Sequence, residues 1–308
     1  MITIPLTNLS VHPLCLGGNV FGWSADETES HAVLNAYARH GGNFVDTADV
    51  YSEWKEGHIG GESETIIGNW MKARCNRDAM VIGTKIGKLS TRPGLSSANI
   101  IAACEDSLRR LQSDHIDIYY SHYDDEETPL AETLEAFTKL IAQGKVRYIA
   151  SSSYAPERLE EALRISKENN LAPYIAVQDQ YNLVYRKDFE NGSAKILREN
   201  GMSIIPFFGL ARGFLTGKYR PGVTVNSLRA KGVADYQNER GWSAVALLET
   251  IAAAHNSSIS SIALAWLRAQ PTVSVPIASA RTVEQLEEIV QVVELTTDEI
   301  SQLSAITA

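Results

Sequence analysis

Four side chains in this sequence follow short apolar segments and could together deliver a proton. Asp46 belongs to NFVDTA, Tyr51 lies in the loop that follows it, Lys85 ends MVIGTK and His122 ends IDIYYSH. A tyrosine with an ordinary pKa near 10 is a poor acid at neutral pH unless its anion is stabilised. We expect the Lys85 ammonium to lower the pKa of Tyr51, and a carboxylate to hold that lysine charged and in place. A nearby histidine can orient a bound carbonyl or relay the proton.

Each of these residues, taken alone, also has a structural interpretation. An aspartate after a strand is commonly a turn or cap residue, and a histidine there is often hydrogen-bonded within the fold. Tyr51 could be a rim aromatic, and Lys85 a cation at the mouth of a barrel. As a set, the four fit the protonation of an alkoxide as it forms. The implied partner is a hydride donor, because no side chain supplies hydride.

The elements that must position these residues form a regular series of apolar β-type segments and amphipathic stretches. The β-type segments begin near Leu14, Asn43, Met80, Ile116, Val146, Ile175, Met202 and Val273. Six of the seven intervals measure 27 to 37 residues, about the length of one βα unit. Continuous apolar strands are typical of a buried parallel sheet. This series predicts a (β/α)8 TIM barrel over residues 1–308, as a single domain. A doubly wound sheet is the rival, and it would usually show a glycine-rich phosphate loop.

Local signals add three expectations. ITIPL and LSVHPL flank Thr7-Asn8 and predict a short hairpin that closes the bottom of the barrel. Ser24 and Glu27 have the spacing of a capping box at the start of the first barrel helix. Residues 211–241 are polar, contain glycine and follow the seventh strand. We expect them to form a ligand-binding loop, because loops after barrel strands lie at the catalytic face.

Composition narrows the possible partners. The 308 residues are 44% hydrophobic and 21% charged, as in ordinary globular proteins, and the net charge is −9. That balance argues against a basic nucleic-acid surface. The three cysteines show neither disulfide nor metal-site spacing. With no signal peptide and no apolar run near the ~18 residues of a membrane helix, we expect a cytoplasmic protein without a bound metal.

Several ordered segments resemble the aldo-keto reductase family, from about Leu16 to Glu288. They are NFVDTADVYSEW, GGESETIIGNWM, VIGTKIG, SLRRLQSDHIDIYYSHYDDEETPLAETLEAF, GKVRYIASSSYAPERL, ARGFLTGKYR and VPIASARTVEQLEE. The family's catalytic Asp-Tyr-Lys-His tetrad matches Asp46, Tyr51, Lys85 and His122. The resemblance implies a TIM-barrel oxidoreductase that reduces aldehydes or ketones, or oxidises alcohols, with NADP(H) and with Tyr51 as general acid.

The resemblance also implies a cofactor site along the loops after the later strands. Its residues would be Ser152, Ser153, Gln178, Phe207, Leu210, Gly213, Leu215, Lys218, Ser279, Arg281, Gln285 and Glu288. Arg281 is the residue expected to select NADP(H), because a guanidinium pairs bidentately with a phosphate. The sequence departs from the family pattern at three places. Ser153 replaces an asparagine, Phe207-Phe208-Gly209 replaces Tyr-Ser-Pro, and Ile289 stands where an asparagine is usual.

The substrate side is less defined by sequence. Trp23, Trp54 and Tyr123 follow strands one, two and four, and they could form an aromatic pocket beside Tyr51. Two other functions stay open. A Schiff-base aldolase or lyase could use Lys85 as its nucleophile. A regulatory subunit resembling potassium-channel β-subunits would keep the tetrad without needing turnover.

Overall fold

The computed structural model describes residues 1–223, 225 and 230–307. Its main element is an eight-stranded parallel sheet in the order β10-β3-β4-β5-β6-β7-β8-β9. The strands are β3 (Cys15–Gly17), β4 (Phe44–Asp46), β5 (Val81–Ile86), β6 (Ile116–Ser121), β7 (Val146–Ser152), β8 (Tyr174–Gln178), β9 (Ser203–Ile204) and β10 (Ile277–Ala278). The strands therefore follow one another around the sheet in chain order, apart from the last, which lies beside the first.

The sheet closes into a barrel between β9 and the segment that leads into β10. Ile204 forms a parallel bridge with Val273, and the backbone N–H of Ile277 donates to the carbonyl of Pro206 at 2.9 Å. The eighth strand, expected from Val273, thus begins pairing there and continues as β10. The predicted (β/α)8 fold is confirmed.

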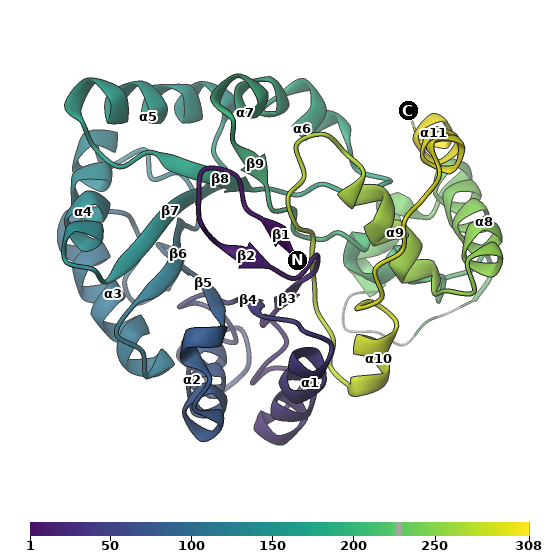
Figure 1. Ribbon diagram of the computed structural model, residues 1–308, viewed down its shortest axis with the longest axis horizontal. Coiled ribbons are helices and arrows are strands. Elements are labelled where there is room, and N and C mark those ends of the chain that lie inside the picture. The colour runs from purple at the N-terminus through teal and green to yellow at the C-terminus, as the bar shows by residue number, and fades with distance from the viewer. Residues whose placement is uncertain (224, 226–229, 308) are drawn as a thin grey trace.

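Helices surround the barrel on the outside (Figure 1). Those after the first five strands are α1 (Glu27–Arg39), α2 (Glu62–Arg74), α3 (Ser97–Leu111), α4 (Leu130–Ala142) and α5 (Pro156–Asn169). The later helices are α6 (Lys187–Asn191), α7 (Ala194–Asn200), α8 (Glu239–Ala254), α9 (Ile259–Arg268), α10 (Val283–Glu287) and α11 (Thr297–Ile306), with 3₁₀ turns η1 (Arg77–Ala79), η2 (Ala211–Thr216) and η3 (Ala230–Tyr236). No helix in the described part of the chain is both long and apolar enough to cross a membrane.

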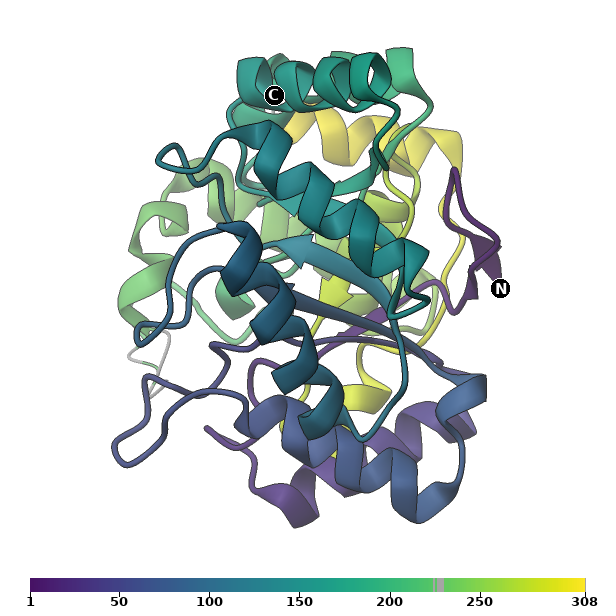
Figure 2. The ribbon, with the colours of Figure 1, turned by 90° about the vertical axis from the view of Figure 1, so that its left-hand side faces the viewer.

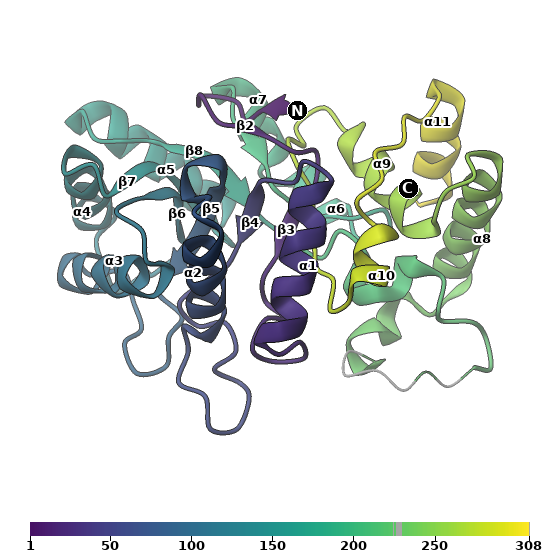
Figure 3. The ribbon, with the colours of Figure 1, turned by 60° about the horizontal axis from the view of Figure 1, so that its bottom comes forward.

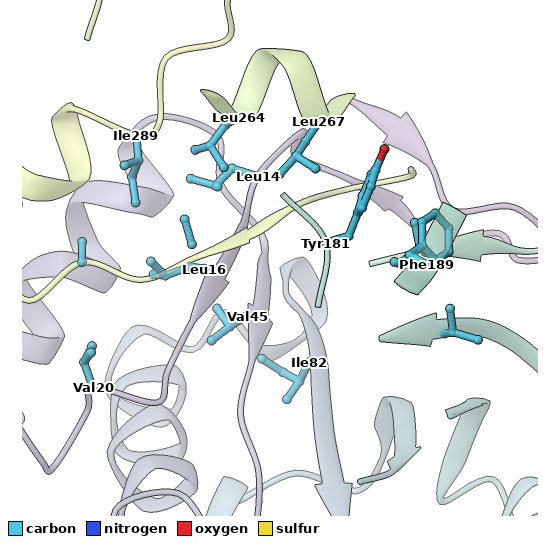
Figure 4. Close-up of a cluster of buried hydrophobic side chains, with 14 of the residues drawn as sticks. Leu14, Leu16, Val20, Val45, Ile82, Tyr181, Phe189, Leu264, Leu267 and Ile289 are labelled. Atoms are coloured by element: carbon cyan, nitrogen blue, oxygen red, sulfur yellow. The ribbon is translucent and has the colours of Figure 1, made fainter. Parts of the chain in front are cut away.

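Alternation along the strands divides the apolar side chains between two cores. Phe44, Val81 and Ile118 belong to a cluster that fills the barrel interior. Their neighbours Val45 and Ile82 belong to a larger cluster between barrel and helices, where Figure 4 shows them with Leu264 and Leu267 of α9. This period-two pattern is what a strand buried on both faces requires.

The N-terminal segment forms the expected hairpin, from β1 (Ile2–Thr3) and β2 (Ser10–Val11) in antiparallel pairing. Ile4, Leu9 and Val11 of this hairpin pack into the barrel's inner cluster. Figures 2 and 3 place it at the end of the barrel opposite the long loops that follow the strands. The hairpin therefore covers the bottom of the barrel and leaves the catalytic face open.

The first barrel helix begins two residues later than the capping prediction. Asp26 is the N-cap of α1, and it forms a capping box with Glu29 rather than Ser24 with Glu27. Both pairs have the three-residue spacing, so the sequence pattern alone does not separate them. The backbone of Ser24 instead closes a turn, with its N–H donating to the carbonyl of Val20 at 3.0 Å.

The predicted ligand-binding loop, residues 211–241, contains η2 and η3 and runs into α8. Residues 224 and 226–229 of this loop lie outside the described residues. Within η2, Arg212 and Gly213 have φ values of 57° and 94°. Left-handed conformations of this kind are rare for residues other than glycine, and they concentrate at functional sites.

The three cysteines have contrasting environments. Cys15 is buried inside the barrel, and Cys104 is buried on α3. Cys75 caps the end of α2 and is exposed. Because α2 runs from the catalytic face back to the start of β5, Cys75 lies at the bottom of the barrel.

Candidate active site

The barrel strands place three of the four predicted catalytic residues by simple alternation, and the fourth, Tyr51, lies in the loop after β4. Phe44 and Val81 face the barrel interior, so Asp46, two residues after Phe44, and Lys85, four after Val81, face it as well. Tyr120 is also an interior residue, and His122 follows it with the same parity. Each polar residue lies at the carboxyl end of its strand. The interior is therefore apolar at the bottom and polar at the catalytic face.

Lys85 lies at the centre of the resulting cluster. Its ammonium donates to both carboxylate oxygens of Asp46 at 2.7 Å, to the carbonyl of Thr47 at 2.7 Å and to the Tyr51 hydroxyl at 3.0 Å. The Tyr51 hydroxyl lies 3.3 Å from Asp46 Oδ2. Gln178 also donates to Asp46, at 2.8 Å. Lys85 is completely buried, and its hydrogen bonds are those of a fixed ammonium.

Burial and charge shift the pKa values of this cluster. Desolvation, followed by the charge of Asp46, raises the pKa of Tyr51 well above 10. Desolvation lowers the pKa of Lys85, and the charge of Asp46 opposes that shift. Tyr51 therefore keeps its proton at neutral pH. The net shift of the Tyr51 pKa is therefore upward and not downward as expected, because burial and the charge of Asp46 are its largest causes.

His122 is held uncharged. Desolvation, followed by the charges of Lys85 and Lys88, lowers the pKa of His122 well below 6.5. Its ring centroid lies 6.0 Å from that of Tyr51. Among the described residues, neither His122 Nδ1 nor the hydroxyl of Tyr120 has a hydrogen-bond partner, although both atoms are buried. Buried polar atoms of this kind call for a partner supplied by a ligand or water.

A pocket of about 770 Å³ opens over this cluster. Asp46, Tyr51 and His122 line it, and Lys85 lies beneath them. Trp23 and Trp54 line it too, and their rings meet edge to face with centroids 5.6 Å apart.

The third predicted substrate residue is placed differently. Tyr123 is not among the residues that line the pocket, and its ring instead packs near Gly87. The structure therefore places Trp23 and Trp54 in the pocket wall beside Tyr51. Tyr123 lies outside the pocket and packs against the loop that follows β5.

The predicted cofactor residues extend the pocket away from the tetrad. Eleven of the twelve line it, namely Ser152, Ser153, Gln178, Phe207, Leu210, Gly213, Lys218, Ser279, Arg281, Gln285 and Glu288. Leu215 is completely buried in the core. Its N–H donates to the carbonyl of Leu210 at 3.2 Å, within the turn that carries the other predicted residues of this segment.

Close backbone approaches shape the wall of this extension. A Cβ at Gly213 would lie 3.1 Å from Lys218 Nζ, so the lysine side chain passes across this glycine. A Cβ at Gly17 would lie 2.5 Å from the hydroxyl of Ser279. Both glycines therefore keep room for side chains that line the pocket.

Ser279 and Gln285, two further predicted cofactor residues, also have side-chain partners within the protein. The Ser279 hydroxyl donates to Asn19 Oδ1 at 2.6 Å. The N–H of Arg281 donates to Gln285 Oε1 at 3.0 Å, which fixes the backbone beneath the exposed Arg281 side chain. These contacts prearrange the wall of the pocket.

The serine that departs from the family pattern occupies a strained position. Ser153 has a φ of 58°, a conformation that asparagine tolerates better than serine. Its N–H donates to Asp179 at 2.7 Å. Desolvation raises the pKa of Asp179 to about 6, and this hydrogen bond opposes the shift. The carboxylate thus secures a turn that the asparagine would otherwise favour.

Sequence reasoning missed several polar residues of the pocket wall. Asn19, Lys88 and Arg212 all line it. Asn19 and Lys88 follow β3 and β5, so the rule that chemistry collects after barrel strands could have identified both. Arg212 stacks over the Phe208 ring, with its guanidinium carbon 4.3 Å from the centroid. Among the described residues, no cluster of histidine, cysteine or carboxylate side chains could hold a metal ion.

Comparison with known proteins accounts for this arrangement. The Aldo/keto reductase family profile matches residues 13–308. The chain belongs to the aldo/keto reductase family. The predicted resemblance is therefore confirmed over nearly the whole chain.

Individual relatives include enzymes and a channel subunit. The chain is 32% identical to the uncharacterized oxidoreductase YrpG of Bacillus subtilis, over 95% of this chain and 90% of that protein. It is 33% identical to L-glyceraldehyde 3-phosphate reductase of Escherichia coli, over 75% and 69%. It is 30% identical to a probable voltage-gated potassium channel subunit beta of Arabidopsis thaliana, over 94% and 89%. Oxidoreductases thus stand among its relatives.

Proposed function

We propose that this aldo/keto reductase family member is an NADP(H)-dependent carbonyl reductase with Tyr51 as its general acid. The observation that carries the proposal is the contact between the Lys85 ammonium and the Tyr51 hydroxyl at the floor of the pocket, 3.0 Å apart. A phenol beside a buried, fixed ammonium is suited to give a proton to an oxygen that gains negative charge.

Tyr51 and Lys85 divide the proton transfer between them. The pKa of Tyr51 is raised well above 10. At neutral pH its hydroxyl therefore carries the proton that it would donate. As the proton leaves, the growing negative charge on the phenolic oxygen meets the Lys85 ammonium at hydrogen-bond distance. Asp46 binds that ammonium with both oxygens and keeps it in place. In alcohol oxidation the same groups accept the proton.

The imidazole of His122 supplies orientation. It lines the pocket beside the Tyr51 ring and is uncharged, because its pKa is lowered. A neutral imidazole can hydrogen-bond the carbonyl oxygen without competing with Tyr51 as the acid. On this proposal the tyrosine donates the proton and the histidine positions the substrate.

The residues along the rest of the pocket fit a nicotinamide dinucleotide. When bound, NADPH supplies the hydride that no side chain can. Ser152, Ser153 and Gln178 would hold the carboxamide end, and Phe207 would offer a ring for stacking. Lys218 and Arg281 would hold the phosphates, with Arg281 on the 2′-phosphate. Ser279, Gln285 and Glu288 line the same end of the pocket.

The test is NADPH consumption with a panel of aldehydes and ketones. Tyr51→Phe should lower kcat by about 10²–10⁴-fold, because it removes the proton donor, and should retain NADPH binding. Tyr119→Phe is the matched control. It removes a buried hydroxyl that has no partner among the described residues and lies outside the pocket. Undiminished turnover in Tyr51→Phe would contradict the proposal.

The relative named as a potassium channel subunit favours a second function, that of a regulatory subunit. Its 30% identity covers 94% of this chain. Tight NADPH binding without turnover of any carbonyl, together with a stable protein partner, would support it. The aldolase alternative is disfavoured, because the buried Lys85 is committed as a donor to Asp46, Thr47 and Tyr51.

A further inference from the structure

The end of the pocket near the tetrad has a cation that the proton-transfer scheme does not use. Lys88 lies three residues after Lys85 and lines the pocket with Tyr51 and His122. The charge of Lys85 is balanced by Asp46. Among the described residues, by contrast, no carboxylate lies within ion-pair distance of Lys88. The wall beside the reacting position therefore has a positive charge that no carboxylate of the described residues balances.

The loop around Lys88 is fixed from both sides. Leu89 is buried against the loop that follows β4, where a Cβ at Gly60 would lie 2.5 Å from its Cδ1. The N–H of Ser90 donates to Glu53 at 3.1 Å, and its hydroxyl donates to the same carboxylate. These contacts tie the Lys88 loop to the loop that contains Trp54. The backbone of Lys88 is thus held in place next to the pocket.

The electrostatic surroundings of Lys88 point to the same conclusion. Its side chain is exposed to water, yet enough protein surrounds the ammonium that desolvation, followed by the charge of Lys85, lowers its pKa. Lys88 and His122 line the same pocket, and the charge of Lys88 contributes to lowering the pKa of His122. A partly desolvated cation with no carboxylate beside it gains most from an anion supplied by a ligand.

We propose that Lys88 binds an anionic group, phosphate or carboxylate, of the carbonyl substrate. The inference rests on the proposed reductase function and names the substrate class of the same site. The anion would lie on the Lys88 side of the tetrad while the carbonyl faces Tyr51 and His122. The Trp23–Trp54 wall would contact the carbon skeleton between them.

The test compares matched carbonyls that differ in charge. One pair is glyceraldehyde 3-phosphate with glyceraldehyde, and the other is 4-carboxybenzaldehyde with benzaldehyde. For the wild type we expect kcat/KM to favour the anionic member by about tenfold or more, equivalent to about 1.4 kcal/mol. Lys88→Gln should lower that preference about tenfold through KM, and Lys88→Arg should keep it. Preference in only one pair would identify phosphate or carboxylate as the recognised group.

Two controls make the result specific. Lys72→Gln removes an equal charge from the outer surface of α2 and should leave the preference unchanged. Raising the ionic strength should reduce the preference of the wild type and have little effect in Lys88→Gln, because salt screens the charge pair. No preference in the wild type, or a preference that survives in Lys88→Gln, would overturn the proposal.

Failure of the inference is distinguishable from failure of the proposed function. If the wild type turns over both members of each pair equally, the reductase function stands and the Lys88 inference fails. If it turns over no carbonyl, the reductase function fails. The inference is then decided by the Kd of glycerol 3-phosphate and 4-(hydroxymethyl)benzoate for the NADP⁺ complex. Equal Kd values for wild type and Lys88→Gln would overturn it.

Discussion

The residue types Tyr51 and Lys85 predicted a lowered pKa for the tyrosine, whereas burial in the structure raises it. The pair was predicted from its position after two strands, and the structure places the two groups 3.0 Å apart. The direction of the Tyr51 pKa shift could not be predicted, because it depends on burial and on the 3.3 Å approach of Asp46. The closed barrel sets the distance between Asp46 and Tyr51, and the sequence alone does not give that distance.

Arg281 carries a residue-scale prediction about cofactor choice. Arg281→Ala should weaken NADPH binding by about 10- to 100-fold, because a charge-assisted pair with the 2′-phosphate contributes about 1.5–3 kcal/mol. NADH, which lacks that phosphate, should bind the variant and the wild type alike. Fluorescence titration of both cofactors measures the two dissociation constants.

The control for this variant is Arg39→Ala, which removes an exposed arginine from the last turn of α1. It should change neither dissociation constant. Equal affinities of the wild-type protein for NADPH and NADH would contradict the assignment of Arg281.

At the scale of elements, the loop between β4 and α2 joins the site to a buried acidic cluster. Asp49 lies in this loop, is almost completely buried and has a carboxylate oxygen without a partner among the described residues. Glu64 of α2 is buried nearby and accepts from Thr84 at 2.5 Å and from Arg110 at 2.6 Å. The loop that contains Tyr51 therefore packs around buried carboxyl groups, and burying their negative charge costs free energy.

Asp49 gives this loop a predicted pH dependence. Desolvation, followed by the charge of Glu64, raises the pKa of Asp49 from 3.8 to about 7. The native state then holds a proton that the unfolded chain has lost, so the free energy of unfolding should fall between about pH 4 and about pH 7, by at most about 4 kcal/mol. Asp49→Asn should reduce this fall. Urea unfolding of both proteins across that pH range measures it.

Asp78→Asn, at an exposed position of η1, is the matched control and should leave the pH profile of stability unchanged. A wild-type stability that rises between pH 4 and pH 7, with no difference in Asp49→Asn, would show that the Asp49 carboxyl is ionised without penalty.

Element boundaries were predictable where strong apolar segments define them, and less so elsewhere. The strands that start at Ile116 and Val146 begin where expected. The N-cap of α1 is Asp26 and not Ser24 as predicted. The sequence did not separate the two, because each is followed by a glutamate at the same spacing. Leu215 of η2 stays a predicted cofactor residue through its backbone, and its side chain is buried in the core. A family motif fixes which residues form a turn, whereas side-chain direction follows from the turn's backbone angles.

For the whole molecule, we propose that residues 1–308 form one domain. The barrel sheet joins β3 to β10, and the outer core is shared by helices from α1 to α11. Far-ultraviolet circular dichroism and tryptophan fluorescence should therefore report one coincident thermal transition. NADPH at about 100 times its Kd should stabilise the entire transition by about 2.7 kcal/mol.

The five tryptophans suit this measurement because they lie along much of the chain, at positions 23, 54, 70, 242 and 266. Two separate transitions, or an NADPH effect on only one of two steps, would contradict a single domain.

The position of Cys75 allows a thiol reagent to modify the protein at the bottom of the barrel alone. Desolvation raises the pKa of the Cys104 thiol to about 12 and raises that of Cys15 well above 9, so both buried thiols stay protonated. Thiol reagents require an accessible thiolate, which leaves Cys75 as the reactive cysteine of the three. Coupled to a maleimide surface, the molecules would attach by the bottom of the barrel. Each immobilised copy would then present its pocket to the solution.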